Sequence, residues 1–334
     1  MSQRISGGSS PLPVLGSLLI LLPILLAGCA APQPQDYSEL LASDAVPTEP
    51  RLTDHELITA DGAHLPLRAW LPAGKVKAVI LAVHGFNDYS NAFDGPGTQL
   101  AYEGIATYAY DQRGFGAAPL RGRWVGRWQL ASDVALASRL IRARYPGTPF
   151  YLLGESMGGA VVTIAMTGEG GTARPQADGV ILVAPAVWSR SDMPWSYRAA
   201  LWTVGHTMPW VTFTGRGLKI WPSDNIEMLR KLARDPLFQH QTRADAIYGL
   251  VNLMDEAHKA PARLGRSPPI LFLYGAKDQI IPKAPTEEVI KALGDRARVK
   301  RYDHGYHMLM RDLEAKTVWS DALDWIASGR STPD

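Results

Sequence analysis

Short hydrophobic runs of four to six residues recur along this chain, and segments in which apolar residues have helical spacing separate them. Unbroken runs of this length are typical of strands buried on both faces, as in a parallel sheet covered by helices. The expected strands are residues 78–83, 105–110, 150–153, 180–184, 270–274 and 299–302. The expected helices are residues 130–145, 157–167, 286–293 and 311–326. This alternation predicts an α/β fold.

Two segments depart from the alternation. Residues 55–58 and 65–71 flank Asp61-Gly62, a strong signal for a hairpin turn, so the folded part is expected to open with an antiparallel pair of strands. Residues 186–261 contain no clear buried-strand run and are rich in tryptophan, which predicts a mostly helical insertion. The expected organisation is an α/β core of residues 51–187 and 261–334, with a helical lid at residues 188–260 inserted between two strands.

The first 28 residues form a separate hydrophobic segment. Arg4 is their only charged residue, and residues 12–27 are apolar apart from Ser17. A positive start, a short apolar run and small residues at its end are typical of a signal peptide. The run is shorter than the roughly 20 residues that a membrane-spanning helix needs. We therefore expect residues 1–28 to be a signal peptide.

The chain has one cysteine, Cys29, which follows this segment directly. The residues Leu-Ala-Gly-Cys at 26–29 resemble the bacterial lipobox, which implies cleavage before Cys29 and lipidation of its thiol and new N-terminus. Ala30 at the next position resembles lipoproteins of the outer membrane, so the resemblance implies a lipid-anchored protein of the bacterial cell envelope. An ordinary signal peptide or a membrane anchor beside a chance cysteine is the alternative.

Residues 29–50 contain four prolines among polar residues and are expected to form a semi-extended tether. An ordered N-terminal arm is the alternative.

Composition removes several classes of function. With 34 basic and 32 acidic residues the net charge is +2, which argues against electrostatic binding of nucleic acid. One cysteine permits neither an internal disulfide nor a cysteine metal cluster. No metalloprotease, phosphate-loop or dinucleotide motif occurs, so no metal or cofactor is expected. Five histidines lack metal-ligand spacing and are expected at surface or packing positions: His55, His64, His206, His240 and His258.

The motif G-E-S-M-G-G at residues 154–159 follows an expected strand and opens an expected helix. In that setting a sharp turn lifts the serine hydroxyl to the carboxyl end of the strand, where the helix N-terminus favours developing negative charge. The motif therefore predicts Ser156 as a catalytic nucleophile. A glycine-rich structural turn is the alternative.

A serine nucleophile needs a base, and the base needs an orienting acid; in this class of fold they follow the serine in the order acid, then histidine. Asp278 and His307 each lie just beyond an expected strand, at the same edge of the sheet as Ser156. His304 is a rival for the base and Asp303 for the acid, although Asp303 is too close in sequence to reach around His307.

The oxygen of a tetrahedral intermediate needs preorganised donors. We expect these to be the N–H groups of Met157 and of Phe86, because Phe86 lies in the loop after the first buried strand. His84, two residues earlier, is expected to orient this loop.

These residues resemble the α/β-hydrolase fold and, within it, the monoacylglycerol lipase and lysophospholipase-like group, also called the serine aminopeptidase S33-like family. The likeness covers about residues 50–327 and rests on His84-Gly85, D-Q-R-G-F-G at residues 111–116, the serine motif, Asp278 and His307. Asp-Pro-Leu at residues 235–237 resembles a phrase near the end of the family's lid. The resemblance implies an eight-stranded sheet whose second strand is antiparallel, a helical lid and a Ser156–Asp278–His307 triad.

The insertion carries five of the ten tryptophans between residues 188 and 221. Their side chains pack the lid onto the core, or line an acyl channel or enter the lipid headgroup layer, and both interpretations can hold at once. We therefore expect a hydrolase of lipid-like esters, of the monoacylglycerol or lysophospholipid class, acting through an acyl-enzyme on Ser156. An aminopeptidase or amidase is the alternative, with Glu227, Asp255 and Glu256 as candidates for an amine pocket. A lipoprotein that binds a ligand without catalysis is a more remote alternative.

Overall fold

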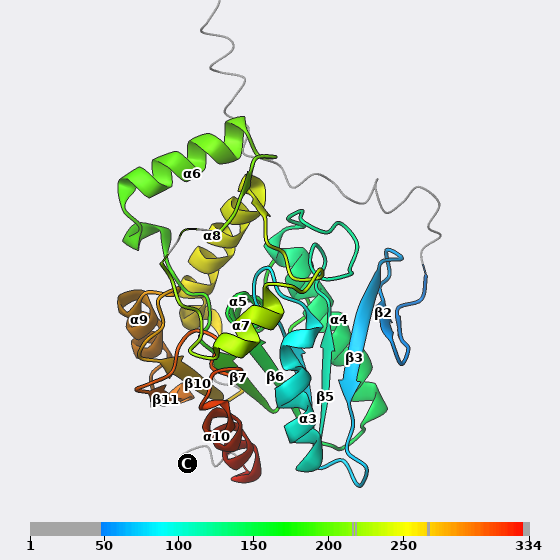
Figure 1. Ribbon diagram of the computed structural model, residues 1–334. Helices are drawn as coiled ribbons and strands as arrows, with labels where there is room; N and C mark the ends of the chain where they lie inside the picture. The colour runs from blue at the N-terminus through cyan, green and yellow to red at the C-terminus, as the bar shows by residue number, and fades with distance from the viewer. Residues whose placement is uncertain (1–47, 216, 218, 266–267, 330–334) are drawn as a thin grey trace, which may run out of the picture.

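The computed structural model describes residues 48–215, 217, 219–265 and 268–329, so the expected signal peptide, Cys29 and most of the tether lie outside the described residues. A mixed sheet of nine strands forms the centre, in the order β1-β2-β3-β5-β4-β6-β7-β10-β11 (Figure 1). Its strands are β1 (Arg51–Leu52), β2 (Glu56–Ile58), β3 (His64–Trp70), β4 (Ala78–Val83), β5 (Ile105–Tyr110), β6 (Phe150–Glu155), β7 (Gly179–Val183), β10 (Ile270–Gly275) and β11 (Ala297–Tyr302).

The direction of the strands matches the α/β-hydrolase expectation, with one correction. β3 pairs antiparallel with both β2 and β5, whereas β5, β4, β6, β7, β10 and β11 pair parallel. The expected hairpin around Asp61 is the β2–β3 pair. The sheet has nine strands rather than eight, because the two-residue β1 pairs antiparallel with β2 at the edge.

Helices cover both faces of the sheet (Figure 1). Residues 79, 81 and 83 of β4 belong to a core shared with helices α4 and α5, whereas residues 78, 80 and 82 belong to a core shared with α3 and α10. This alternation is the period of two that a strand imposes on its side chains. The core helices are α3 (Asp94–Tyr102), α4 (Arg127–Arg144), α5 (Met157–Ala165), α9 (Lys283–Leu293) and α10 (Ala315–Ala327), and short 3₁₀ turns are η2 (Ser90–Phe93), η4 (Ala260–Arg263) and η5 (Gly294–Arg296).

Between β7 and β10 the chain leaves the sheet and forms three helices. These are α6 (Trp195–Thr207), α7 (Ile226–Leu232) and α8 (Ala244–Lys259), with the 3₁₀ turn η3 (Arg190–Asp192) and a small antiparallel pair of β8 (Thr212–Phe213) and β9 (Thr242–Arg243). α8 packs on the core, whereas α6 extends away from the sheet (Figure 1). None of the helices among the described residues combines the length and apolar character required to traverse a bilayer.

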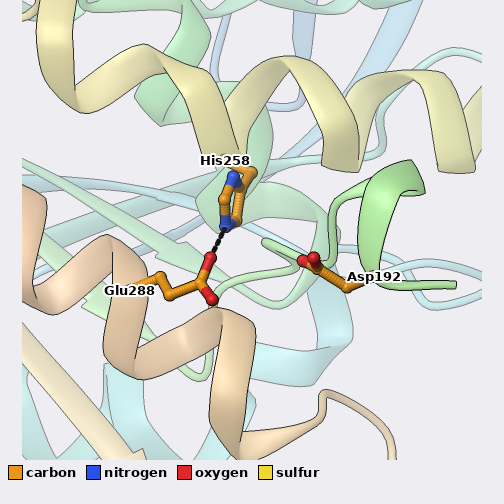
Figure 2. A group of neighbouring side chains, drawn as sticks. All are labelled: Asp192, His258 and Glu288. Atoms are coloured by element: carbon orange, nitrogen blue, oxygen red, sulfur yellow. Dashed lines mark ion pairs between the residues drawn. The ribbon is translucent and has the colours of Figure 1, made fainter.

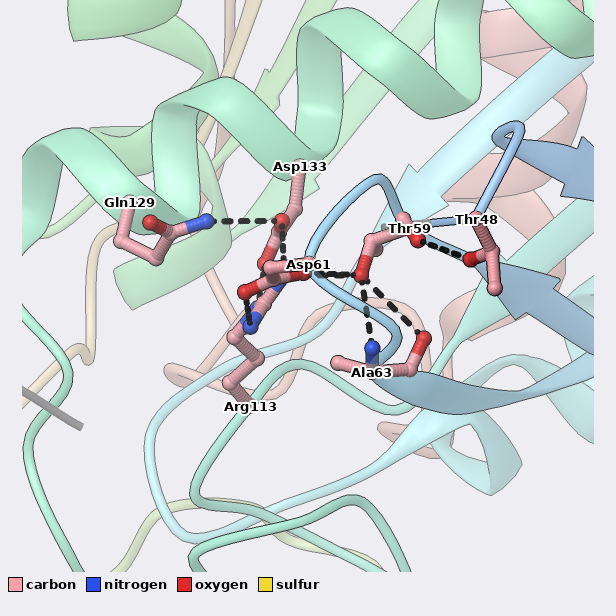
Figure 3. A network of polar contacts seen from close by, with 7 residues as sticks. All are labelled: Thr48, Thr59, Asp61, Ala63, Arg113, Gln129 and Asp133. Atoms are coloured by element: carbon pink, nitrogen blue, oxygen red, sulfur yellow. Dashed lines mark hydrogen bonds and ion pairs between the residues drawn. The ribbon is translucent and has the colours of Figure 1, made fainter. Parts of the chain in front are cut away.

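A buried arginine ties the opening hairpin to the core (Figure 3). Arg113 donates to both carboxylate oxygens of Asp61 in the hairpin turn, at 2.6 and 2.9 Å, and its Nε donates to Asp133 of α4 at 2.7 Å. Burial alone would raise the pKa of Asp61, but hydrogen bonds from Arg113 and Thr59 and the charge of Arg113 lower it to about 2. The network therefore stabilises the ionised form of Asp61.

Candidate active site

Ser156 lies at the turn from β6 to α5 and has φ of 53° and ψ of −119°. Its N–H donates to the carbonyl oxygen of Val183 at 2.9 Å, which fixes the turn to the neighbouring strand. A Cβ atom at Gly158 would lie 1.9 Å from the carbonyl oxygen of Val83, so only glycine permits this approach of α5 to β4. The turn predicted from G-E-S-M-G-G is therefore present, with the serine between strand and helix.

His307 joins the serine to a buried carboxylate. Its Nε2 lies 2.8 Å from Ser156 Oγ, and its Nδ1 lies 2.8 Å from Asp278 Oδ2. The Asp278 side chain has no exposed area, and its second oxygen accepts hydrogen bonds from the N–H groups of Ile280 and Ile281. An ionised Asp278 only accepts hydrogen bonds, so Nδ1 of His307 must donate, which leaves Nε2 free to accept the serine proton.

The structure separates the predicted base and acid from their rivals. Asp278 follows β10 and His307 follows β11, so that His307 contacts Ser156 and Asp278 contacts His307 at the carboxyl ends of these strands. Asp303 and His304 lie in the turn directly after β11 and are exposed. The arrangement therefore places His307, and not His304, beside the serine.

The loop after β4 approaches the serine closely. A Cβ atom at Gly85 would lie 3.3 Å from Cβ of Ser156, so glycine allows the backbone to pass beside the hydroxyl. Phe86 follows on this loop and lines the same cavity as Ser156. Among the described residues, neither the N–H of Phe86 nor the N–H of Met157 donates a hydrogen bond to a backbone carbonyl. Their roles as oxyanion donors stay predictions.

His84 holds this loop in place from beneath. Its Nδ1 lies 2.8 Å from the carbonyl oxygen of Gly85, and its Nε2 accepts a hydrogen bond from the N–H of Gln112 at 2.9 Å. The side-chain amide of Gln112 returns a hydrogen bond to the carbonyl oxygen of His84. Burial lowers the pKa of His84, which favours the neutral ring that this pattern needs. Gln112, the second residue of the D-Q-R-G-F-G motif, thus positions the loop through His84.

A buried cluster of charges lies next to the serine and was also missed. Arg311 Nη2 lies 2.7 Å from Asp88 Oδ2 and 3.4 Å from Glu155 Oε2. Burial raises the pKa of Glu155, and the charge of Arg311 opposes that rise. Arg311 connects the loop after β4, the residue before Ser156 and the segment that carries His307. The only signal in the sequence was the position of Glu155 inside the serine motif.

A cavity of about 590 Å³ opens onto Ser156 and His307, within the size range of small-molecule sites. Its walls are mainly apolar and come largely from the insertion: Trp188, Met193, Tyr197, Leu201, Phe238, Ile247, Leu250, Val251 and Met254.

The three acids considered for an amine pocket do not line this cavity. Glu227 pairs with Arg230, Asp255 with Lys259 and Glu256 with Arg263. The two acids at the cavity, Asp88 and Glu155, face Arg311. Each acid that lines the cavity therefore already has Arg311 as its cation.

Comparison with known proteins agrees with this geometry. The profile of the family described as "Serine aminopeptidase, S33" matches residues 74–314. A monoglyceride lipase from Rattus norvegicus is 26% identical over 279 residues, covering 81% of this chain and 89% of that protein. A monoacylglycerol lipase from Mycolicibacterium smegmatis is 23% identical over 281 residues, covering 83% of this chain and 97% of that protein.

Solved structures share this fold. The monoacylglycerol lipase of Paleococcus ferrophilus superposes with a TM-score of 0.64 at 22% identity, covering 79% of this chain and 99% of that one. A soluble variant of monoglyceride lipase from Saccharomyces cerevisiae gives a TM-score of 0.70 at 18% identity, covering 85% of this chain and 99% of that one. The chain belongs to the serine aminopeptidase S33 family of α/β-hydrolases and is a serine ester hydrolase.

Proposed function

We propose that this protein cleaves the carboxylic ester of a monoacylglycerol or lysophospholipid through an acyl-enzyme on Ser156. The observation that carries the proposal is the mainly apolar cavity that opens onto Ser156 and His307. Such walls suit a fatty acyl chain, because burying apolar surface is favourable at about 25 cal/mol per Å². The relatives named as monoglyceride lipases support the same class of substrate.

In the first half-reaction, Ser156 Oγ attacks the ester carbonyl carbon while its proton moves to Nε2 of His307. Asp278 stabilises the resulting imidazolium, and the N–H groups of Phe86 and Met157 donate to the carbonyl oxygen as it becomes negative. The bond to the alcohol oxygen then breaks, and His307 protonates the leaving alcohol. The acyl group remains on Ser156 as an ester.

In the second half-reaction, water attacks the acyl-enzyme and gives its proton to Nε2 of His307. The bond from the acyl carbon to Ser156 Oγ breaks, and His307 returns the proton to the serine. The fatty acid leaves, and the starting state is restored.

We further propose that the enzyme works at the outer membrane, anchored through a lipidated Cys29, with the insertion as a lid. Trp195 of α6 is 76% exposed, and Trp202 and Trp210 are also exposed. Aromatic side chains of this kind favour the headgroup layer of a bilayer. The 18 residues between Cys29 and Thr48 can span at most about 60 Å, which sets the greatest distance between the anchor and Thr48.

The mechanism is tested by labelling the purified protein with a fluorophosphonate and assaying acyl esters of increasing chain length. We expect Ser156→Ala to lose both labelling and hydrolysis, and the wild type to prefer long acyl esters. Retained labelling in Ser156→Ala would disprove the nucleophile. A preference for aminoacyl amides over acyl esters would instead favour the aminopeptidase.

The anchor is tested by fractionating cells that produce the wild type or Cys29→Ala. We expect the wild type in the membrane fraction, with mass spectrometry showing an N-terminal Cys29 that carries acyl chains, and no acyl mass on the variant. Membrane-bound wild type with an uncleaved and unacylated Cys29 would argue for an uncleaved anchor in place of lipidation.

A further inference from the structure

We propose a zinc site formed by Asp192, His258 and Glu288, on the side of the insertion that faces α9. These side chains come from η3, α8 and α9, and they point toward one another (Figure 2). Each offers one ligand atom, and the three atoms all lie within 4.8 Å of one another. Nε2 of His258 lies 3.3 Å from Oε2 of Glu288. The three residues do not take part in the proposed ester hydrolysis.

Among the described residues, the charges at this cluster are balanced only in part, through the ion pair between His258 and Glu288. Among the described residues, neither Asp192 nor Glu288 has a lysine or arginine partner. Nε2 of His258 is closed to solvent and has no hydrogen-bond partner. A buried imidazole nitrogen without a hydrogen bond costs free energy, and two carboxylates beside it attract a cation. A divalent metal satisfies the nitrogen and both carboxylates.

The position of Asp192 is held from α8. Asp255, one turn before His258, accepts hydrogen bonds from the hydroxyl of Ser189 and from the N–H of Arg190, both at 3.0 Å. These bonds fix η3 against α8, so Asp192 stays close to His258. Glu288 is 60% exposed and its side chain can rotate inward. Ligand atoms around a zinc ion lie roughly 3.4 Å apart, which needs a closure of only about 1 Å here.

The ligand set points to zinc among the common divalent ions. Imidazole and carboxylate ligands suit zinc, whereas magnesium and calcium prefer oxygen ligands alone. Binding would join η3 and α8 of the insertion to α9 of the core. α8 carries the cavity residues Ile247, Leu250 and Val251, so zinc would fix one wall of the cavity to the core.

No sequence motif indicates this site. Asp192 and His258 are 66 residues apart, and Glu288 follows 30 residues later. No local ligand spacing exists, so His258 was expected at a surface or packing position. The cluster arises only because α8 packs on α9.

The test is a zinc titration of the purified, chelator-treated protein, followed by calorimetry and by thermal unfolding. We expect one equivalent of zinc to bind and the melting temperature to rise. Glu288→Gln and His258→Gln should each weaken zinc binding by more than about 100-fold, since each removes a ligand. His55→Gln removes an exposed histidine outside the cluster and should bind zinc as the wild type does. The titration is repeated on protein whose Ser156 carries the fluorophosphonate label, because the label prevents zinc from binding at His307.

Absence of saturable zinc binding would overturn the proposal, as would wild-type affinity in Glu288→Gln. If His258→Gln fails to fold, Glu288→Gln and Asp192→Asn decide, because both carboxylates are exposed and their removal spares the core. Ester hydrolysis is not the readout, so failure of this proposal leaves the proposed function untouched.

Discussion

The core and the insertion differ in the side chains that they bury and expose. The core buries Arg113, Asp133 and Glu155, residue types that are almost never buried unless paired. The insertion exposes Trp195 and Trp210, although tryptophan usually packs in a hydrophobic core. A buried charge is tolerated when a partner meets it, and an exposed apolar patch marks a surface that binds something.

The core positions the candidate catalytic groups, whereas the insertion supplies most of the apolar residues that line the cavity. In the core, buried polar pairs connect loops that are distant in sequence: Gln112 holds His84, and Arg311 holds Asp88 beside Glu155. Such contacts keep the candidate catalytic groups in one geometry. In the insertion, α6 extends away from the sheet and leaves Trp195 and Trp202 exposed. Substitutions in the two regions should therefore change different measurements.

The largest effect is expected at the buried acid. Asp278→Asn should lower kcat on a short, water-soluble ester by about 10⁴-fold, because an amide lets His307 adopt the wrong tautomer. Circular dichroism should show an intact fold. Asp303→Asn is the matched control, since Asp303 is the exposed rival carboxylate, and its kcat should stay near that of the wild type. An equal loss in both variants would overturn the assignment of the acid.

The second largest effect is expected at Arg311. Arg311→Met should lower the free energy of unfolding by about 3–5 kcal/mol, because it leaves Asp88 and Glu155 buried without their cation. Urea unfolding measures the loss. Arg230→Met removes an exposed pair with Glu227 and should change the free energy of unfolding by less than about 1 kcal/mol. Equal losses in the free energy of unfolding for the two substitutions would mean that the buried ion pairs of Arg311 stabilise the fold no more than an exposed ion pair does.

Much of the fold could be predicted because buried parallel strands leave a strong signal. The runs at residues 78–83 and 105–110 match β4 and β5 to the residue, since every position in them is buried. α3 was not predicted, because Gly95, Pro96 and Gly97 are poor helix formers and the helix is stabilised by its packing instead. α10 begins four residues later than predicted, because residues 311–314 form turns.

The candidate site also contains residues that could be predicted from the sequence and residues that could not. Ser156, Asp278 and His307 follow strands whose ends meet at one edge of the sheet, so the sequence could bring them together. The partnership of Arg311 with Asp88 and Glu155 joins residues more than 150 positions apart, and single charged residues carry no periodic signal. Long-range pairs of this kind require the coordinates.

A smaller effect is expected in the insertion. Replacing Trp195 and Trp202 together by serine, in a Cys29→Ala background, should weaken binding to lipid vesicles by about tenfold, because both exposed indoles lose their apolar contact with the bilayer. The kcat/KM on a short soluble ester should not change. Tyr102→Ser is the control, since it removes an exposed aromatic residue of α3 in the core. Wild-type vesicle binding by the double variant would leave the exposed tryptophans without a role at the membrane.

The smallest effect returns to the core and depends on pH. In the folded protein Arg113 and Thr59 lower the pKa of Asp61 to about 2 against the opposing effect of burial, whereas an unfolded aspartate has a pKa of about 3.9. The stabilisation is therefore complete above about pH 4 and is lost as the pH falls toward 2. The Asp61 side chain is 41% exposed, so solvent screening limits the loss in Asp61→Asn to about 1 kcal/mol at pH 7. Urea unfolding should show the variant and wild type converging at low pH, and Asp54→Asn, at a side chain 90% exposed, should show no such pH-dependent difference. If the difference in free energy of unfolding between Asp61→Asn and the wild type persists near pH 2, the effect comes from the shape of the hairpin turn and not from its charge. The acid-sensitive part of the core would then be limited to its fully buried pairs.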